Sequence, residues 1–222
     1  MMCSKQISYP FEMFCYTDNY DGIWKNINII PFVENDFDIV VYNKLFLFSH
    51  EFNKLLPDGE RVYFDLDVVI KKNIDDIVTF KQGDLTLIDA EWRLKHEYGF
   101  PVFHHPFNSS CMTWSNSAPY NLWEHVKKDP EFFMTKYRWG MDSFLFYEKQ
   151  NAGINIGYFP SRKFYSYLLG VDIAENSLYE PVTLSYRESK LRHITNHIPV
   201  VLLNGPTTPE QYSYVFKQHY KS

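Results

Sequence analysis

The first half of the chain alternates short apolar runs with polar residues, a pattern typical of strands bounded by turns. Asp, Asn, Gly and Pro separate four such runs, FEMFCYT (11–17), INIIPF (27–32), FDIVVY (37–42) and RVYFDLDVVI (61–70). Between the last two, NKLFLFSHEFNKLLPDG (43–59) has room for a helix of about three turns before a Pro-Asp-Gly turn. Strand, helix and strand in this order predict a parallel crossover unit.

The rest of the pattern adds further strands and helices. Strands are predicted at 85–92 and 197–210, and a turn with a short helix at 71–80. Residues 119–137 predict a helix that Pro130 breaks or restarts, because proline lacks the amide donor that an interior turn requires. The whole pattern predicts an α/β fold with a mostly parallel central sheet flanked by helices.

The composition suits a single domain that handles a small ligand. At 222 residues and 26.5 kDa, with 45% hydrophobic and 18% aromatic residues, the chain can bury one sizeable core. A formal charge of −5 indicates no basic surface that could bind nucleic acid. The sequence also has no Lys/Arg run long enough to bind an anionic membrane. No stretch approaches about 18 consecutive apolar residues, so no membrane span is predicted.

Cysteine usage and the N-terminal residues favour a cytoplasmic location. The 3 cysteines have no CxxC spacing, which is typical of reduced thiols in a cytosolic protein. The first residues, MMCSKQISYPFEM, lack the cationic segment followed by an apolar segment that a secretory signal requires. We therefore expect a cytoplasmic protein.

Two like charges interrupt the apolar run at 61–70. Asp65 and Asp67 flank Leu66, and alternate side chains of a strand face the same way, so both carboxylates would project together. Such a pair repels and loses hydration unless something positive lies beside it. Mg²⁺ and Mn²⁺ take one or two protein carboxylates and fill other positions with water and phosphate oxygens. The pair indicates either a metal site for a nucleotide diphosphate at a strand end or two surface aspartates.

The block around these aspartates resembles a known family. YNKLFLFSHEFNKLLPDGERVYFDLDVVIKKNIDDI (42–77) is similar to the core of GT-A fold, nucleotide-sugar-dependent glycosyltransferases of the glycogenin-like and small bacterial or viral kind. In them a Lys-Leu-bearing helix precedes an Asp-x-Asp strand. The similarity covers 11–92 well and the rest in patches. It implies one domain over 1–222, with a nucleotide- and metal-binding half (1–100) and a donor-sugar and acceptor half (101–222).

The resemblance assigns the first half to the donor nucleotide and a metal ion. It implies that Asp65 and Asp67 hold Mn²⁺ (or Mg²⁺) and through it the donor diphosphate, with Leu66 among the nucleotide-sugar contacts. Lys44 matches a lysine that reaches the nucleotide, and its alternative is a solvated helix lysine. The turn CYTDNYDG (15–22) matches the base-binding corner or is a plain Asp-Asn-rich turn. Its candidate residues are Thr17, Asp18 and Tyr20.

Further along the chain, one segment resembles the strand that lines the donor-sugar pocket. This segment is NSSCMTW (108–114). Asn108 offers both a donor and an acceptor to sugar hydroxyls, Ser109 lies beside it, and Trp114 would stack on a sugar face. The resemblance leaves the acceptor to the aromatic, loop-rich region 150–190.

The next segment, WGMDSFLF (139–146), resembles the family's Asp-Gln pair, with Ser143 where glutamine is usual. The resemblance implies that Asp142 is the catalytic residue, near the reacting sugar carbon as base, transient nucleophile or acceptor orienter. The alternative is a carboxylate at a helix N-terminus, a position that suits aspartate.

The segment VVLLNGPTTPEQ (200–211) departs from the family pattern of a His near a Gly followed by Lys-Pro. Asn204 or Leu202 stands where a histidine metal ligand is expected, and Thr208 where a diphosphate-binding lysine is expected. We expect Asn204 or water to complete the metal shell and Gly205 to contact the donor. The chain also begins too late for the strand that larger relatives carry ahead of 11–17. Either the fold is pared down or the chain is one domain of a larger polypeptide.

The sequence therefore predicts a metal-dependent glycosyltransferase that moves a hexose from a nucleoside diphosphate sugar, UDP-linked by expectation, to a hydroxyl on a glycan or protein. Two alternatives stay open. A haloacid-dehalogenase-like phosphohydrolase also carries Asp-x-Asp at a strand end, with Asp65 as nucleophile and Asp67 as acid/base. However, its motif usually lies on the first strand, and Val68 fills a place where small residues open a flap loop. The other alternative is a nucleotide-sugar or glycan-binding module without catalysis.

Overall fold

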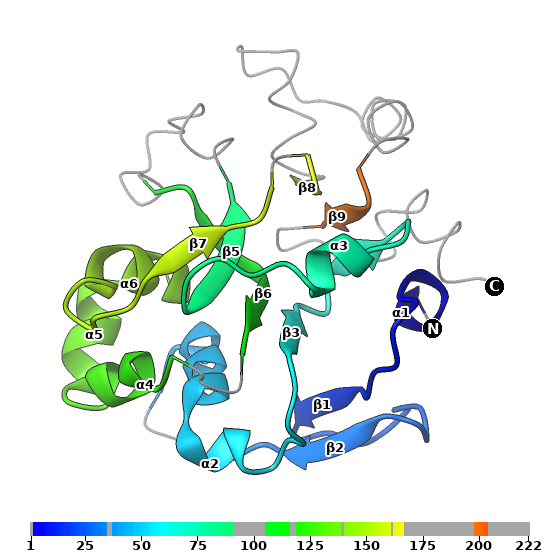
Figure 1. The fold of residues 1–222 in the computed structure, drawn as a ribbon. Helices are drawn as coiled ribbons and strands as arrows, with labels where there is room; N and C mark the ends of the chain where they lie inside the picture. The colour runs from blue at the N-terminus through cyan, green and yellow to red at the C-terminus, as the bar shows by residue number, and fades with distance from the viewer. Residues whose placement is uncertain are drawn as a thin grey trace, which may run out of the picture.

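The protein is a mixed α/β fold in which three small sheets carry helices beside them (Figure 1). The computed structural model describes residues 2–34, 37–90, 105–115, 119–138, 140–160, 162–166 and 198–203. In chain order the elements are α1 (Met2–Gln6), β1 (Phe14–Thr17), β2 (Asn28–Pro31), η1 (Val40–Phe48), α2 (His50–Asn53), β3 (Arg61–Phe64), β4 (Val68–Ile70), α3 (Asp75–Val78), β5 (Leu85–Asp89), β6 (Phe107–Trp114), α4 (Tyr120–Val126), α5 (Pro130–Lys136), α6 (Met141–Glu148), β7 (Ile156–Tyr158), β8 (Phe164–Ser166) and β9 (Val200–Leu202).

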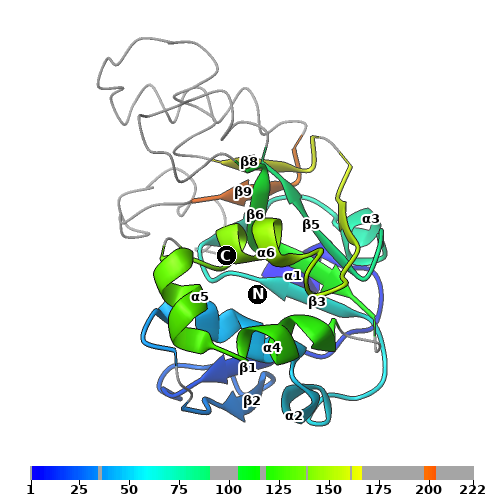
Figure 2. The same ribbon diagram turned by 90° about the vertical axis from the view of Figure 1, so that its left-hand side faces the viewer.

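The central sheet has the order β3-β6-β5-β7. β6 runs antiparallel to both β3 and β5, whereas β7 runs parallel to β5. Because strand side chains alternate, Leu87 and Met112 join the larger apolar core, and Ile88 and Cys111 join a second core on the other face. Figure 2 shows α4, α5 and α6 in front of this sheet. All 8 positions of β6 are buried, as expected of a strand covered on both faces.

A second sheet joins β4, β9 and β8 in that order. β4 is antiparallel to β9, and β9 is parallel to β8. All positions of β4 and β9 are buried, and Ile77 of α3 and Ile74 just before it belong to the same core. The predicted late buried strand and the short helix after the aspartates are therefore confirmed, although the turn expected after β9 lies outside the described residues.

The β1–β2 pair is parallel and forms a sheet of its own. Asn28 and Phe32 donate their backbone N–H to the carbonyls of Met13 and Thr17, at 2.8 and 2.9 Å. The backbone hydrogen-bonding groups of the even-numbered residues of β2 therefore point towards β1, and those of the odd-numbered residues point outward. Position 31 is proline, which has no N–H to offer a further strand, so the outer edge of β2 is protected against pairing with another chain.

The prediction of one strand over 61–70 is wrong, because Asp65 to Asp67 form a turn between β3 and β4. The Asp65 N–H still bonds to the Ser110 carbonyl of β6, at 2.9 Å, and the Val68 N–H turns back to the Asp65 carbonyl. β4 then leaves the first sheet and pairs with β9. Two carboxylates would lose hydration inside a continuous buried strand, and a turn relieves that cost. The expectation that alternation along a strand aligns both aspartates therefore fails.

The predicted strand at 37–42 and the long helix at 43–59 are also wrong. Val40–Phe48 is a 3-10 helix, and only His50–Asn53 is an α-helix, capped by the Ser49 hydroxyl that accepts from the Phe52 N–H at 2.9 Å. The predicted parallel crossover unit is absent from the described residues, since β3 pairs with β6 in antiparallel fashion. Three pairings between described strands are parallel and three antiparallel, so the mostly parallel sheet is only partly confirmed.

The helix predicted over 119–137, with its break or restart at Pro130, is confirmed as α4 and α5. α4 ends at Val126, and Pro130 starts α5 at a position where its missing N–H costs nothing. The Asp129 carboxylate caps α5 by accepting from the Phe132 N–H at 3.0 Å. Among the described residues, no helix combines the length and the apolar character that crossing a bilayer demands.

Candidate active site

The Asp65–Asp67 turn lies at the end of β3 and is held by both neighbouring sheets. On one side the Asp65 N–H bonds to the Ser110 carbonyl of β6 at 2.9 Å, and on the other the Asp67 carbonyl accepts from the Leu203 N–H at 3.0 Å. Leu66 projects outward with 95% of its surface exposed. An exposed leucine at the tip of a hydrogen-bonded turn is accessible to a ligand, and its contact with the nucleotide stays a prediction.

The Asp65 carboxylate already has a cation beside it. Lys44 of η1 places its Nζ 2.6 Å from Oδ1 and 2.7 Å from Oδ2. The Tyr63 hydroxyl of β3 donates to Oδ1 at 2.5 Å. Burial and the Asp65 charge raise the pKa of Tyr63, so the phenol keeps its proton and acts as a donor. The structure thus places Lys44, predicted to reach the nucleotide, beside Asp65, predicted to bind the metal ion.

Asp67 has a different environment. Its side chain is half-buried, and burial together with the Asp65 charge raises the pKa of its carboxyl group. The backbone N–H of Asp67 and the charge of Lys44 oppose that rise in pKa, and among the described residues no side chain donates to the Asp67 carboxylate or forms an ion pair with it. A desolvated carboxylate next to a second carboxylate gains most from a cation that approaches both.

β6 connects this turn to α6, which carries the predicted catalytic residue Asp142. Ser110, whose carbonyl accepts from the Asp65 N–H, donates its own N–H to Asn108 Oδ1 at 3.0 Å. The Ser109 N–H donates to Asp142 Oδ1 at 3.0 Å. Asp65, Asn108, Ser109 and Asp142 are therefore linked through three consecutive residues of one strand. The structure thus connects Asp65 and Asp142, which lie 77 positions apart in the sequence, while their roles stay predictions.

Asp142 lies in the first turn of α6, where a carboxylate interacts favourably with the helix dipole. Gly140 begins this helix with a φ of 120°, which disfavours any L side chain. An added Cβ would also meet Cγ2 of Val41 at 2.9 Å, so glycine is required both by conformation and by space. Gly140 therefore sets where α6 starts and how Asp142 approaches β6.

Ser143, where the family usually has glutamine, contacts His105, which lies just before β6. The Phe107 N–H donates to His105 Nδ1 at 3.3 Å, so Nδ1 is the acceptor and the proton of the neutral ring is on Nε2. Nε2 then donates to the Ser143 hydroxyl at 3.0 Å. Because the imidazole donates here, it cannot act as a base on Ser143. The pair instead fixes the start of α6 against β6.

The other predicted residues are not joined to this group. The Thr17–Tyr20 turn is stabilised internally: the Asn19 N–H donates to the Thr17 hydroxyl and the Asp21 N–H to Asn19 Oδ1. Asp18 and Tyr20 are exposed, and no described contact connects them to Asp65. Asn204 and Gly205 lie outside the described residues.

Trp114 does not meet the expectation that it stacks on a sugar. It is 3% exposed and packs edge-on against Phe48 in the core, with ring centroids 5.3 Å apart. It ends β6 opposite Arg61, whereas Asp65 adjoins the other end of the pairing. Trp114 is therefore a core residue.

The sequence interpretation missed two residues that support the site, Tyr63 and His105. Tyr63 could have been found, because alternation along β3 places residues 63 and 65 on one side. His105 carried no signal, since its role depends on how α6 packs against β6.

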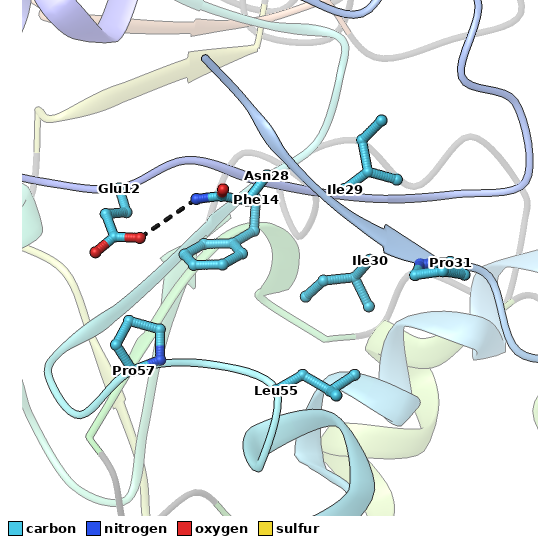
Figure 3. Close-up of a pocket in the computed structure, with 8 residues that line it drawn as sticks. All are labelled: Glu12, Phe14, Asn28, Ile29, Ile30, Pro31, Leu55 and Pro57. Carbon is cyan, nitrogen blue, oxygen red and sulfur yellow. Dashed lines mark hydrogen bonds between the residues drawn. The ribbon is translucent and has the colours of Figure 1, made fainter. Parts of the chain in front are cut away.

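An open cavity lies elsewhere in the described part of the chain. It has a volume of about 360 Å³ and is lined mainly by apolar side chains of β1, β2 and the segment after α2 (Figure 3). Its polar edge is the Glu12–Asn28 pair, at 3.3 Å. Pro57, which lines it, accepts a hydrogen bond from Arg61 at the start of β3. Asp65 follows the opposite end of that strand, so this cavity is separate from the candidate site.

The donor set at the Asp65–Asp67 turn suits a hard divalent cation. Both side chains supply carboxylate oxygens, the ligands that Mn²⁺ and Mg²⁺ prefer. Among the described residues there is no cluster of three or more His, Cys, Asp or Glu side chains. Two carboxylates with water and phosphate oxygens in the remaining positions are the usual way for such ions to bind with a nucleotide.

Comparisons with known proteins bear on the fold. No family model and no curated protein matches the sequence. Among solved structures, an active-site mutant of LgtC matches with a TM-score of 0.50 at 17% identity, over 92% of this chain and 80% of that one. The galactosyltransferase LgtC with donor and acceptor sugar analogs matches at 0.47 and 17%, over the same shares. Glycosyltransferase GlyE of Streptococcus pneumoniae matches at 0.47 and 11%, over 86% and 47%.

The match to the LgtC mutant supports a GT-A-like glycosyltransferase fold for this chain, as the sequence resemblance predicted. The likeness covers most of both chains and concerns their architecture. The activity has to be argued from the residues at the site.

Proposed function

We propose that the protein is a metal-dependent glycosyltransferase that moves a hexose from a UDP-sugar to a hydroxyl of a glycan or protein acceptor. The observation that carries the proposal is the hydrogen-bonded connection from Asp65 through Asn108–Ser110 to Asp142, set in a GT-A-like fold. Two carboxylates that can hold a metal-diphosphate, and a third that the resemblance sets near the sugar, are groups that such a transfer can use.

Each part of the site has a role in this proposal. Asp65 and Asp67 hold Mn²⁺ or Mg²⁺, which when bound would neutralise the charge that develops on the leaving diphosphate. Asn108 offers its amide to the donor sugar while its Oδ1 is held by the Ser110 N–H. The Ser109 N–H fixes Asp142, which then faces the reacting carbon from a defined position.

The two alternative interpretations are not favoured. A phosphohydrolase of the haloacid-dehalogenase kind carries its motif on the first strand, whereas β1 and β2 precede β3 here. LgtC, whose mutant matches this fold, is a galactosyltransferase. A binding module without catalysis would have no need to hold Asp142 against the strand that also holds Asp65.

The test is release of UDP from a panel of UDP-hexoses, measured with Mn²⁺ and again in chelator. We expect release with at least one donor in Mn²⁺ only, and loss of that release in Asp65→Ala. Inhibition by fluoroberyllate with no response to any UDP-sugar would support the phosphohydrolase and reject the proposal. Release that persists undiminished in chelator would also reject it.

A further inference from the structure

The Asp65 carboxylate is partly occupied before any metal arrives. The Lys44 ammonium contacts both of its oxygens, at 2.6 and 2.7 Å, and the Tyr63 hydroxyl adds a third contact at 2.5 Å. The side chains of Lys44 and Asp65 are only 21% and 19% exposed, so water screens this ion pair incompletely. The Lys44 ammonium also lies 5.5 Å from the Tyr63 ring centroid, a favourable cation–π distance.

These contacts oppose a second cation at the same carboxylate. A carboxylate accepts through about four lone-pair directions, and Lys44 and Tyr63 use three contacts. A divalent ion bound to Asp65 would also face the Lys44 ammonium at short range, where like charges repel strongly in a partly desolvated site. Asp67, two residues away, feels the Lys44 charge but forms no close ion pair with Lys44 and no hydrogen bond with Tyr63 among the described contacts, so the two aspartates are unequal as ligands.

We propose that Lys44 is a built-in competitor of the divalent cation at Asp65, which keeps the cation affinity of the free protein low until a diphosphate arrives. The inference rests on the proposed function. Without nucleotide, Asp67 is the main protein ligand and Lys44 stays on Asp65. A diphosphate offers the Lys44 ammonium another anion and brings further oxygens to the cation. Asp65 is then released to the cation, and cation and diphosphate bind with positive coupling.

Binding of Mn²⁺ alone, followed by the paramagnetic resonance of free Mn²⁺, separates this role from a simple nucleotide contact. Lys44→Met, which keeps an unbranched side chain one atom shorter and removes its charge, should tighten Mn²⁺ binding by at least about fivefold, the upper range for a partly exposed ion pair. The same variant should lose most of the gain in Mn²⁺ affinity that saturating UDP gives the wild type. Lys44→Arg keeps a positive charge and should resemble the wild type.

Two further variants make the test robust. Lys128→Met removes a charge from an exposed lysine after α4 and controls for net charge, so its Mn²⁺ affinity should match the wild type. Tyr63→Phe removes one donor from Asp65 and leaves the ring in place. It should tighten Mn²⁺ binding by about two- to threefold, and it carries the test if Lys44→Met does not fold, as judged by circular dichroism.

The outcomes separate the two proposals. Tighter Mn²⁺ binding in Lys44→Met, with Lys44→Arg unchanged, supports the competition. Equal or weaker Mn²⁺ binding in Lys44→Met, with normal binding in the wild type, overturns the competition and leaves the proposed function standing. Absence of Mn²⁺ binding in the wild type, with and without UDP, overturns the metal-dependent function and the competition together.

Discussion

Two shielded carboxylates, Glu148 at the end of α6 and Asp67 in the turn after β3, have opposite environments. Glu148, with a side chain 4% exposed, accepts from Tyr137 (2.5 Å), Asn151 (2.7 Å), Lys136 (2.9 Å) and His125 (3.0 Å). Burial by itself would raise the pKa of Glu148, but the hydrogen bonds from Asn151, Tyr137, His125 and Lys136 outweigh it and lower the pKa to about 2.

Asp67 is the reverse case. Its pKa is raised by burial and by the Asp65 charge, and no described side chain donates to it. The two environments distinguish Glu148, a structural carboxylate, from Asp67, a carboxylate suited to binding a ligand. The hydrogen-bond donors to Glu148 come from α4, from the end of α5 and from the residues just after α6, so Glu148 stabilises the helical layer. Asp67 costs stability when ionised without a partner, and a bound cation would recover that cost.

The largest expected effect is on activity. Asp67→Asn keeps the size of the side chain and removes the negative charge, so metal-assisted departure of the diphosphate should be lost. We expect transfer from the UDP-sugar to fall by about 10³-fold, since metal stabilisation of the leaving group contributes several kcal/mol. Steady-state assays in Mn²⁺ measure this. Glu148→Gln, assayed well below its melting temperature, should keep wild-type kcat/KM. A fall in activity for Glu148→Gln that equals the fall for Asp67→Asn would erase the distinction.

The next effect is on stability. Glu148→Gln leaves the Lys136 ammonium without its counter-charge and turns an acceptor of four hydrogen bonds into a mixed donor and acceptor. We expect the free energy of unfolding to fall by about 3 kcal/mol at pH 7, because folding lowers the pKa of Glu148 from 4.5 to about 2. Urea denaturation measures it. An unchanged urea midpoint would show that the Glu148 cluster contributes nothing.

The sequence predicted the position of the short elements better than their pairing. The strands at β1, β2, β5 and β9 and the restart at Pro130 follow from local apolar runs and from proline geometry. The strand and the helix predicted over 37–59 were wrong. Leu45 to Phe48 are all buried, so the apolar pattern of this segment has neither the period of a helix nor that of a strand. The direction of β3 depends on β6, which lies more than 40 residues later in the chain.

The site shows the same limit. Asp65 and Asp67 are visible as a motif, whereas the placement of Lys44 on Asp65 and of Ser109 on Asp142 depends on packing between distant elements. The Glu148 cluster gave no signal at all, because its donors come from positions 125, 136, 137 and 151 and meet only in the folded helical layer.

The pH dependence of stability should have opposite signs for the two carboxylates. The pKa of Glu148 is lowered on folding, so its contribution is complete above about pH 4.5 and disappears as the pH falls towards 2. The pKa of Asp67 is raised on folding, so its ionisation destabilises the metal-free protein and acidification relieves that cost.

Urea unfolding in chelator between pH 7 and pH 3 tests both signs. The stability gap between wild type and Glu148→Gln should narrow as the pH falls. Asp67→Asn should be more stable than wild type at pH 7, and that advantage should shrink with acidification. Parallel pH curves for the three proteins would contradict the assignment.

The smallest expected effect concerns a single donor. Tyr137→Phe removes one of the four side chains that bond to Glu148 and leaves the other three. We expect a loss of about 1 kcal/mol in the free energy of unfolding, the usual net value of one hydrogen bond. The cation response of the Asp65–Asp67 turn should be unchanged, because Tyr137 contacts Glu148 and the aromatic rings of α6. A Mn²⁺ response altered along with stability would show that the two regions are coupled.

The most direct test of the central claim is the melting temperature with UDP-hexoses and Mn²⁺, added separately and together. The account predicts that a UDP-sugar raises the melting temperature of the wild type by several degrees only with Mn²⁺, since a ligand stabilises the state that binds it. Glu148→Gln should show the same rise from a lower starting value, and Asp67→Asn should show none. An equal rise in chelator, or an undiminished rise in Asp67→Asn, would contradict the claim that Asp65 and Asp67 form a metal-diphosphate site.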